Sequence, residues 1–197
     1  MEATGVILAG GKSSRMQFNK AFANIGGKSI IDIITAKLRR LFKEVIIISN
    51  EPELYQGLGV NVYTDIYPGL GPVSGIHSAL YHASYNTAFI LGCDMPFINM
   101  GLVQYMFENL KDHDSVVPLI DNYLQPTSAV YSKKCLPILT DCLKNNKLKL
   151  VLVFRELDTV MIYEKEIERF GKIKEIFFNV NDLNALVQAR EMAGRLL

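Results

Sequence analysis

Short apolar runs alternate along the chain with longer segments in which apolar residues recur at helical spacing. Residues 44–49 include four consecutive β-branched residues, and a run that is apolar throughout is typical of a strand buried on both faces. In residues 29–42 the apolar positions line one face of a helix. Strands that alternate with helices predict βαβ units and a mostly parallel sheet covered by helices on both faces.

The same pattern predicts an element order for the whole chain. The expected strands are 4–8, 44–49, 60–64, 88–91, 115–119, 123–131, 159–163 and 175–179, and the expected helices are 29–42, 52–58, 72–83, 99–111, 133–144 and 182–197. Residues 147–157 suit a strand by composition and a helix by length, so both interpretations stay open. Asp182 stands where it can cap the last helix.

Composition narrows the class of protein. Of the 197 residues, 49% are hydrophobic and 21% are charged, which favours one globular domain over residues 1–197. Together with the alternating elements, this predicts a three-layer α/β domain. The formal net charge of +1 argues against a nucleic-acid partner. No apolar stretch approaches the roughly 20 residues that span a bilayer. We therefore expect no membrane partner. Because the three cysteines lack metal-ligand spacing, we also expect reduced thiols, which are typical of a cytoplasmic location.

The first expected strand is followed by a glycine-rich, basic loop, LAGGKSSRMQFNK, over residues 8–20. Gly10 and Gly11 allow a ligand to approach the backbone and its amide donors closely. Lys12, Arg15 and Lys20 add three cations in or beside the loop. Backbone amides and cations after a strand predict a polyphosphate site, and the spacing differs from both the P-loop and the dinucleotide fingerprint.

Two carboxylates follow later strands. Asp94 comes directly after the expected strand 88–91, in the sequence LGCDMPF, and Asp65 follows the strand 60–64. In phosphate sites Mg²⁺ takes one or two protein carboxylates and completes its shell with phosphate oxygens and water. We therefore expect Asp94 to hold Mg²⁺ beside the polyphosphate, with Asp65 reaching the same cleft.

The rest of the chain points to the type of reaction. Asn179 and Asn181 flank Val180 at the end of the expected strand 175–179, where alternation would turn both asparagines to one side. No GxSxG, HExxH or paired Cys and His pattern supplies a general base. A phosphate nucleophile is already anionic near pH 7 and needs none. These residues therefore favour a nucleotidyltransferase that joins an NTP to a phosphate-bearing acceptor and releases pyrophosphate, a reaction in which positioning and charge neutralisation dominate.

Five motifs taken together resemble one family. LAGGKSSRM with Lys20, TDIYPGLGPVSGI, LGCDMPF, QPTSAVY and FFNVND occur in an order similar to that of the molybdenum cofactor guanylyltransferases. The resemblance implies a single α/β domain of Rossmann-like topology, with a nucleotide-diphospho-sugar transferase-like fold. It also implies transfer of GMP from Mg-GTP to the molybdopterin cofactor, with release of pyrophosphate, and a protein partner that delivers or accepts that cofactor.

The resemblance further implies roles for single residues. Leu8, Ala9 and Gly10 would hold guanosine, with Gly11 in the same nucleotide-binding loop, and Lys20 and Arg15 would contact phosphates. Asp94 would bind the nucleotide and Mg²⁺, so that Asp94, Lys20 and Arg15 form the expected catalytic set. Asp65 would contact the nucleotide and Asn50 the base or ribose, while Asn179 and Asn181 would lie on the pterin side. Gln17 departs from the family, which usually has glycine after the RM pair.

Two other functions stay open at this point. A cytidylyltransferase acting on the same cofactor, or another small nucleotidyltransferase with a phosphate-bearing acceptor, would need the same phosphate and metal residues. A non-catalytic nucleotide-binding module would need the pocket without Asp94. The presence of Asp94 together with Lys20 and Arg15 favours an enzyme.

Overall fold

A mixed, eight-stranded sheet forms the centre of the computed structural model, which describes residues 1–10 and 19–196. Its strands are β1 Thr4–Leu8, β4 Glu44–Ile48, β5 Asn61–Tyr63, β6 Thr87–Gly92, β7 Ser115–Ile120, β8 Tyr123–Leu124, β9 Ser128–Ser132 and β10 Thr159–Tyr163. They lie in the order β10-β7-β9-β6-β1-β4-β5, and β8 pairs with β7. Only β8 and β9 run antiparallel to their described neighbours in this sheet, so the predicted mostly parallel sheet is confirmed.

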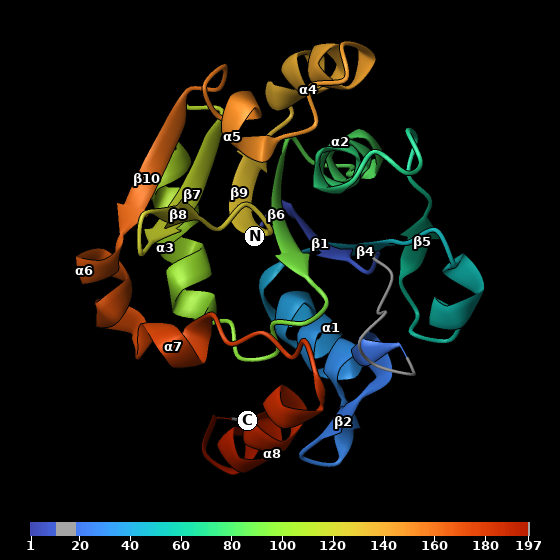
Figure 1. The fold of residues 1–197 in the computed structure, drawn as a ribbon, viewed down its shortest axis with the longest axis vertical. Helices are drawn as coiled ribbons and strands as arrows, with labels where there is room; N and C mark the ends of the chain where they lie inside the picture. Colours follow the sequence, from blue (N-terminus) through green and yellow to red (C-terminus); the bar gives the residue numbers. More distant parts are fainter. Residues whose placement is uncertain (11–18, 197) are drawn as a thin grey trace.

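Helices cover both faces of the sheet (Figure 1). They are α1 Ile30–Leu41, α2 Pro72–His82, α3 Met100–Leu110, α4 Cys135–Lys144, α5 Leu150–Val153, α6 Glu164–Ile167, α7 Ile173–Ile176 and α8 Leu183–Leu196, with 3₁₀ helices η1 Lys20–Phe22, η2 Pro52–Tyr55 and η3 Glu168–Phe170. A small hairpin of β2, Asn24–Ile25, and β3, Lys28–Ser29, lies outside the main sheet. No helix among residues 1–10 and 19–196 is both long and apolar enough to cross a bilayer.

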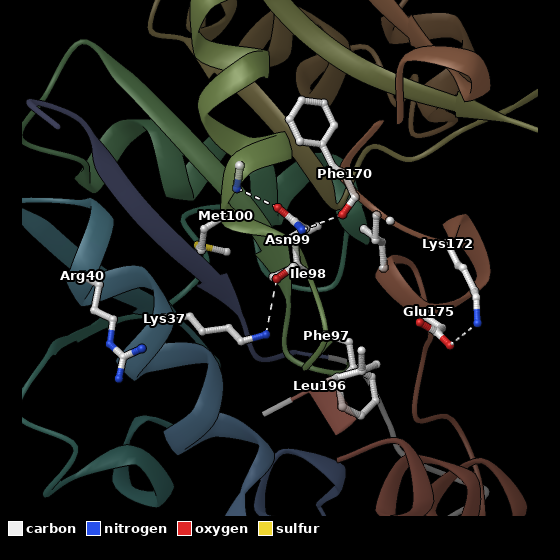
Figure 2. Close-up of a pocket in the computed structure, with 13 residues that line it drawn as sticks. Lys37, Arg40, Phe97, Ile98, Asn99, Met100, Phe170, Lys172, Glu175 and Leu196 are labelled. Atoms are coloured by element: carbon white, nitrogen blue, oxygen red, sulfur yellow. Dashed lines mark hydrogen bonds and ion pairs between the residues drawn. The ribbon is translucent and has the colours of Figure 1, made fainter. Parts of the chain in front are cut away.

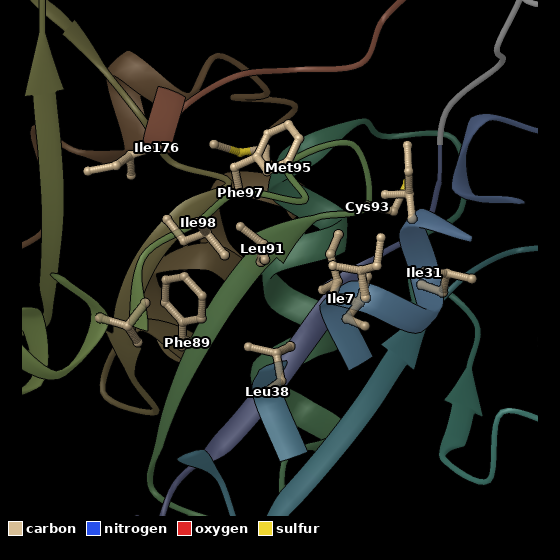
Figure 3. Packing of buried hydrophobic residues seen from close by; sticks show 14 of the residues in the cluster. Ile7, Ile31, Leu38, Phe89, Leu91, Cys93, Met95, Phe97, Ile98 and Ile176 are labelled. Carbon is tan, nitrogen blue, oxygen red and sulfur yellow. The ribbon is translucent and has the colours of Figure 1, made fainter. Parts of the chain in front are cut away.

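The central strands contribute side chains to a core on each face. On β1, Ile7 belongs to the core formed with α1, α3 and α8, whereas Val6 belongs to the core formed with α2, α4 and α5. On β6, Phe89 and Leu91 face the first of these cores, and Figure 3 shows them packed with Leu38 of α1. Burying each such side chain contributes about 1.5–3 kcal/mol. Strands with apolar side chains on both faces produce the unbroken apolar runs seen in the sequence.

Local signals explain where the longest predicted helices begin. Ser29 caps α1, since its hydroxyl oxygen accepts from the amide of Asp32 at 3.2 Å. Pro72 stands at the first position of α2, where its missing N–H costs nothing. The Oδ1 atom of Asp182 accepts from the amide of Ala185 at 2.8 Å at the start of α8, so the predicted cap of the last helix is confirmed.

Three sequence predictions differ from the structure. The strand expected over 175–179 is wrong: Ile173–Ile176 forms α7, and the chain then continues without regular structure to residue 182. Ile176 is buried in the core, and a short apolar run reaches a core equally well from a strand or from a helical turn. The helix expected over 52–58 is the single 3₁₀ turn η2, and Gly57, with a φ of 94°, lies in a region that helices do not use.

The third difference concerns residues 123–131, which form the two strands β8 and β9 instead of one. Pro126 cannot donate to a ladder, and the amide of Ser128 closes a turn on the carbonyl of Gln125 at 3.0 Å. The open segment 147–157 contains the short helix α5. The hairpin of β2 and β3 and the helix α6 are additional elements that the apolar pattern did not predict.

Candidate active site

Four neighbouring parallel strands, β6, β1, β4 and β5, bring their carboxyl ends to one edge of the sheet (Figure 1). The end of β1 therefore lies between Asp94, which follows β6, and the pair of Asn50 and Asp65, which follow β4 and β5. Strands lie about 4.8 Å apart, so Asp94 and Asp65, three strand positions apart, are separated by about 14 Å at the strand ends. The strands that these two carboxylates follow thus lie on opposite sides of β1.

Lys20, Asp94 and Asn181 meet at this edge although they are far apart in the sequence. The Nζ atom of Lys20, the first residue of η1, is 2.5 Å from Oδ2 of Asp94 and 3.3 Å from Oδ1 of Asn181. The side chains of Lys20 and Asp94 are 22% and 18% exposed. The pair is thus partly shielded from water and still accessible to a ligand.

The backbone around Asp94 is held from several directions. Its carbonyl accepts from the amide of Val180 at 2.9 Å, which fixes the segment before α8 beside it. The amide of Cys93 donates to the carbonyl of Leu8 at 3.1 Å, so the turn is also tied to the end of β1. A Cβ atom on Gly92 would lie 2.8 Å from Oδ1 of Asp94. A residue with a side chain at position 92 would therefore displace the carboxylate.

Lys37 of α1 supports the turn that follows Asp94. Its Nζ donates to the carbonyls of Pro96 at 2.8 Å and Ile98 at 3.4 Å, and Figure 2 shows this side chain reaching toward Ile98. Burial lowers the pKa of Lys37 to about 8. Lys37 also lines a cavity of about 380 Å³ next to the start of α3 (Figure 2). Asn99 caps α3, because its Oδ1 accepts from the amide of Gly101 at 2.7 Å. The helix that follows Asp94 therefore does not use the Asp94 carboxylate as its cap.

The start of the glycine-rich loop is fixed by the sheet. Leu8 ends β1, and the amide of Ala9 donates to the carbonyl of Ile48 at 2.9 Å. Gly10 is exposed, and a Cβ atom there would meet nothing within 4 Å. Gly75 of α2 lies against Leu8, because a Cβ atom on this glycine would be 3.5 Å from the leucine methyl carbons, so α2 begins close to this loop. Gly11 and Arg15, which the sequence also indicates, lie outside the described residues.

Asn50 and Asp65 hold each other in a reciprocal pair. The Nδ2 atom of Asn50 donates to Oδ2 of Asp65 at 3.0 Å, and the amide of Asp65 donates to Oδ1 of Asn50 at 3.1 Å. The second carboxylate oxygen of Asp65 is buried and has no hydrogen-bond partner among the described residues. A buried acceptor without a donor costs about 1–3 kcal/mol, and a ligand that carries a hydroxyl or amino group would remove that cost.

Tyr55, at the end of η2, is a site residue that the sequence did not indicate. Its side chain is among the most deeply buried, at 1% exposure. The hydroxyl donates to the carbonyl of Ala9 at 3.4 Å and accepts from Nδ2 of Asn19 at 3.1 Å. Burial raises the pKa of Tyr55, so the hydroxyl keeps its proton. The only hint in the sequence is one large aromatic residue in the polar segment PELYQG.

A cavity of about 880 Å³ lies beside the end of β7 and the helix α7, and Asn179, two residues before Asn181, is part of its lining. Its walls include Ile120, Gln125, Glu168, Lys174 and Asn179. Asn179 donates from Nδ2 to the carbonyl of Phe177 at 3.1 Å, whereas Asn181 contacts Lys20. The expectation that a strand turns both asparagines to one side is wrong, because residues 177–181 form no strand.

Other candidate groups are inert in the described part of the chain. All three cysteines are unpaired and buried. Burial raises the pKa of Cys93 to about 12, so its thiol is not a nucleophile. No group of three or more His, Cys, Asp or Glu side chains gathers as a metal site within residues 1–10 and 19–196. A metal here would therefore be held by few protein ligands.

Comparison with known proteins gives one consistent family. A family model described as a MobA-like NTP transferase domain matches residues 5–160. A "Probable molybdenum cofactor guanylyltransferase" from Pelotomaculum thermopropionicum is 39% identical over 98% of this chain and 94% of its own. A protein of the same name from Clostridium perfringens is 40% identical, over 93% of this chain and 94% of its own. A "Molybdenum cofactor guanylyltransferase" from Desulfosudis oleivorans is 32% identical over 98% of both chains.

Solved structures share the fold at lower identity. Molybdopterin-guanine dinucleotide biosynthesis protein A from Archaeoglobus fulgidus has a TM-score of 0.85 and 23% identity, covering 98% of this chain and 99% of its own. The 2-C-methyl-D-erythritol 4-phosphate cytidylyltransferase from Thermus thermophilus has a TM-score of 0.74 and 19% identity, covering 98% and 100%. The fold is thus one that nucleotidyltransferases with different acceptors use.

Proposed function

We propose that this chain, which belongs to the family of MobA-like NTP transferases, transfers GMP from Mg-GTP to the molybdenum cofactor. The products would be the guanine dinucleotide form of the cofactor and pyrophosphate. The relatives that carry the name molybdenum cofactor guanylyltransferase match nearly the whole chain. The observation that carries the proposal is the contact of Lys20 with Asp94 at 2.5 Å, at the sheet edge where the parallel strands end.

We assign the carboxyl ends of β6, β1, β4 and β5 to GTP and call this region the nucleotide half. Leu8, Ala9 and Gly10 would hold guanosine, and Asn50 with Asp65 would contact the base or ribose. The buried oxygen of Asp65 that has no partner within residues 1–10 and 19–196 supports a donor from the ligand at that position. Gly11 and Arg15 belong to the same assignment through the sequence motif.

Mg²⁺ fits the residues around Lys20, Asp94 and Asn181. Hard oxygen donors suit this ion, which needs only one or two carboxylates when phosphates complete its shell. The carboxylate of Asp94 and the amide oxygen of Asn181 both face the ammonium group of Lys20, so a positive charge is already favoured there. We assign the metal to Asp94. When bound, Mg²⁺ neutralises charge on the polyphosphate and on the leaving pyrophosphate.

The chain's own residues would position the reacting groups. With the carboxylate of Asp94 turned to the metal, Lys20 becomes free to contact a phosphate of GTP, as a charge-assisted donor. An oxygen of the acceptor's phosphate would attack the α-phosphorus, and the bond from the α-phosphorus to the bridging oxygen would break, releasing pyrophosphate. No general base is required, because a phosphate oxygen is already anionic near pH 7.

We assign the cavity of about 880 Å³ to the acceptor and call its lining, with the segment 177–181, the acceptor half. Asn179 lines this cavity, and Asn181 reaches Lys20, so the two asparagines span the distance from the acceptor half to the phosphates. Charged and amide side chains make up most of its lining, beside the apolar Ile120, Ile173 and Phe177, and such a mixed lining suits a polar heterocyclic ligand. This arrangement supports the pterin side for both residues.

We also propose three features that the sequence predicts: a single nucleotidyltransferase domain over residues 1–197, a cytoplasmic location, and a protein partner that delivers or receives the cofactor. A cavity that opens toward solvent would let another protein deliver or receive the cofactor, which supports the proposed partner. The domain extent and the location rest on the sequence alone.

The test is a turnover measurement with the purified chain. Incubation with Mg-GTP and the molybdenum cofactor should release pyrophosphate and yield a product whose mass matches the guanine dinucleotide. Omission of the cofactor and chelation of the metal serve as controls, and each should abolish the product, whereas the Asp94→Asn variant should form it far more slowly. Pyrophosphate release that does not depend on the cofactor, or no release at all with Mg-GTP, would contradict the proposal.

A further inference from the structure

One buried hydroxyl joins the two ends of the glycine-rich loop. Tyr55 donates to the carbonyl of Ala9, which precedes the loop, and accepts from the side chain of Asn19, which follows it. One phenolic hydroxyl has a single proton to donate, and both its donor and its acceptor capacity are used here. Tyr55 is 36 residues from Asn19 and 46 residues from Ala9 in the sequence, so both hydrogen bonds are long-range contacts that depend on the tertiary fold.

Asn19 transmits this contact to the start of η1. While its Nδ2 donates to Tyr55, its Oδ1 accepts from the amide of Ala21 at 3.0 Å and caps the 3₁₀ helix. Lys20 is the residue between the two, so the cap fixes the direction in which its side chain leaves the backbone. The ring of Phe22 lies 5.3 Å from that of Tyr55, which adds an apolar contact to the same segment.

We propose that Tyr55 is a positioning residue for the transfer reaction, which acts through Asn19 to hold Lys20 at the junction of the nucleotide and acceptor halves. This inference rests on the proposed function and extends it, because it assigns a role to η2 that the sequence motifs do not cover. A lysine side chain that leaves a fixed helical turn loses less conformational freedom when it binds a phosphate. The hydroxyl contributes this order, whereas the ring contributes to the core.

The Tyr55→Phe variant separates the two contributions, because it keeps the ring and removes only the hydroxyl. We expect the KM for Mg-GTP and its calorimetric Kd to rise about tenfold, near the upper end of what one buried hydrogen bond contributes. The kcat should stay within about twofold, because the Lys20 contact is recovered once GTP is bound. Tyr81→Phe is the matched control, since it removes a hydroxyl from a side chain on α2 that is 61% exposed, and it should change neither value.

A double-mutant cycle shows whether Tyr55 acts through Lys20. Lys20→Ala alone should weaken Mg-GTP binding by about 45-fold, the middle of the range for a charge-assisted contact. Tyr55→Phe should then add less than about twofold in the Lys20→Ala background, because residues that act through one another are not additive. A full tenfold effect in that background, or wild-type KM and Kd in Tyr55→Phe, would overturn the inference.

Asn19→Ser tests the same hydrogen bond from its other side. Serine keeps an oxygen that can cap η1 and loses the donor to Tyr55, so this variant should reproduce the rise in KM if Tyr55→Phe fails to fold. An Asn19→Ser enzyme with wild-type KM would count against the inference. Failure of the proposed function is recognised separately, because wild-type chain that binds Mg-GTP without transferring GMP would still report the Kd effects of both variants.

Discussion

The nucleotide half and the acceptor half of the sheet edge are built in different ways. In the nucleotide half Asp94, Asn50 and Asp65 each lie two residues after a parallel strand. The polar groups there hold one another, as in the pairs of Lys20 with Asp94 and of Asn50 with Asp65. The acceptor half is an opening of about 880 Å³ between a hairpin and the short helices α6 and α7. Register in a parallel sheet fixes the first kind of site, whereas side-chain packing shapes the second.

This difference has a functional meaning under the proposed reaction. Polyphosphate and Mg²⁺ present the same charges to every nucleotidyltransferase, so a preformed set of cations, amides and a carboxylate serves them well. The acceptor is what distinguishes one enzyme of this fold from another, and the solved relatives are named for acceptors as different as molybdopterin and a methylerythritol phosphate. Substitutions that change one half at a time therefore test whether the two halves have separate roles.

The largest effect is expected at Asp94, where both halves meet. Asp94→Asn keeps the size of the side chain and removes the charge that would hold Mg²⁺. Because a metal contributes several kcal/mol to the transition state and about 1.4 kcal/mol corresponds to a factor of ten, turnover should fall about a thousandfold. Pyrophosphate release and the melting temperature are measured on one preparation. A folded Asp94→Asn variant with near-normal turnover would show that the metal is held elsewhere.

The same division explains what could be predicted from the sequence. Asp94 and Lys20 were identifiable because glycines, cations and a carboxylate directly after apolar strands have few structural reasons to occur together. The partners of these residues follow from the topology, since β1 lies between β6 and β4, and a mostly parallel sheet was itself predictable from alternating elements.

The acceptor half was not predictable for a physical reason. Residues 175–179 are apolar enough for a strand, yet Ile176 reaches the core from the helical turn α7, and the periodicity of five residues does not separate the two. Gln125 and Lys174 meet at one cavity only through tertiary packing. Tyr55 was missed for the same reason, because its two hydrogen bonds join segments 36 and 46 residues away.

Base preference is the next largest effect and belongs to the nucleotide half alone. We expect kcat/KM for GTP to exceed that for CTP by about a hundredfold, because buried groups matched to guanine lose about 1–3 kcal/mol each when left unpaired. The preference should survive Asn179→Ala in the acceptor half. Competing turnover with both nucleotides and mass analysis of the products measures it, and equal values would move this chain to the cytidylyl branch.

A matched pair of asparagine variants sharpens the comparison at a smaller scale. Asn179→Ala should raise the KM for the cofactor about fivefold and leave the Kd for Mg-GTP unchanged, whereas Asn50→Ala should do the reverse, each by the loss of about one hydrogen bond. Steady-state kinetics with either substrate varied, together with calorimetry of Mg-GTP, gives all four values. If both variants raised both constants alike, the edge would act as one site and the division into halves would be wrong.

The smallest expected effect concerns the support beneath the nucleotide half, where α2 lies against Leu8 through Gly75. His77 of α2 meets Thr140 of α4, with 3.1 Å between Nε2 and the threonine hydroxyl oxygen. That hydroxyl donates its one proton to the carbonyl of Leu136 at 2.7 Å, so Nε2 must carry the hydrogen. The Nδ1 atom is buried without a partner among the described residues, and burial, followed by the nearby charge of His82, lowers the pKa of His77.

A lowered pKa means that the unfolded chain binds the proton more readily than the folded one. The contribution of neutral His77 is therefore complete above the unfolded value of about 6.5 and is lost as the pH falls from there through the lower folded value. The melting temperature of the wild type should drop between about pH 7.5 and pH 5.5, the interval that brackets this titration, and His77→Gln should drop less. Glutamine retains a donor for Thr140 but does not titrate, so the carboxylates that protonate in both proteins cancel in the comparison. Equal slopes of melting temperature against pH for the two proteins would show that His77 does not contribute to the pH dependence of stability.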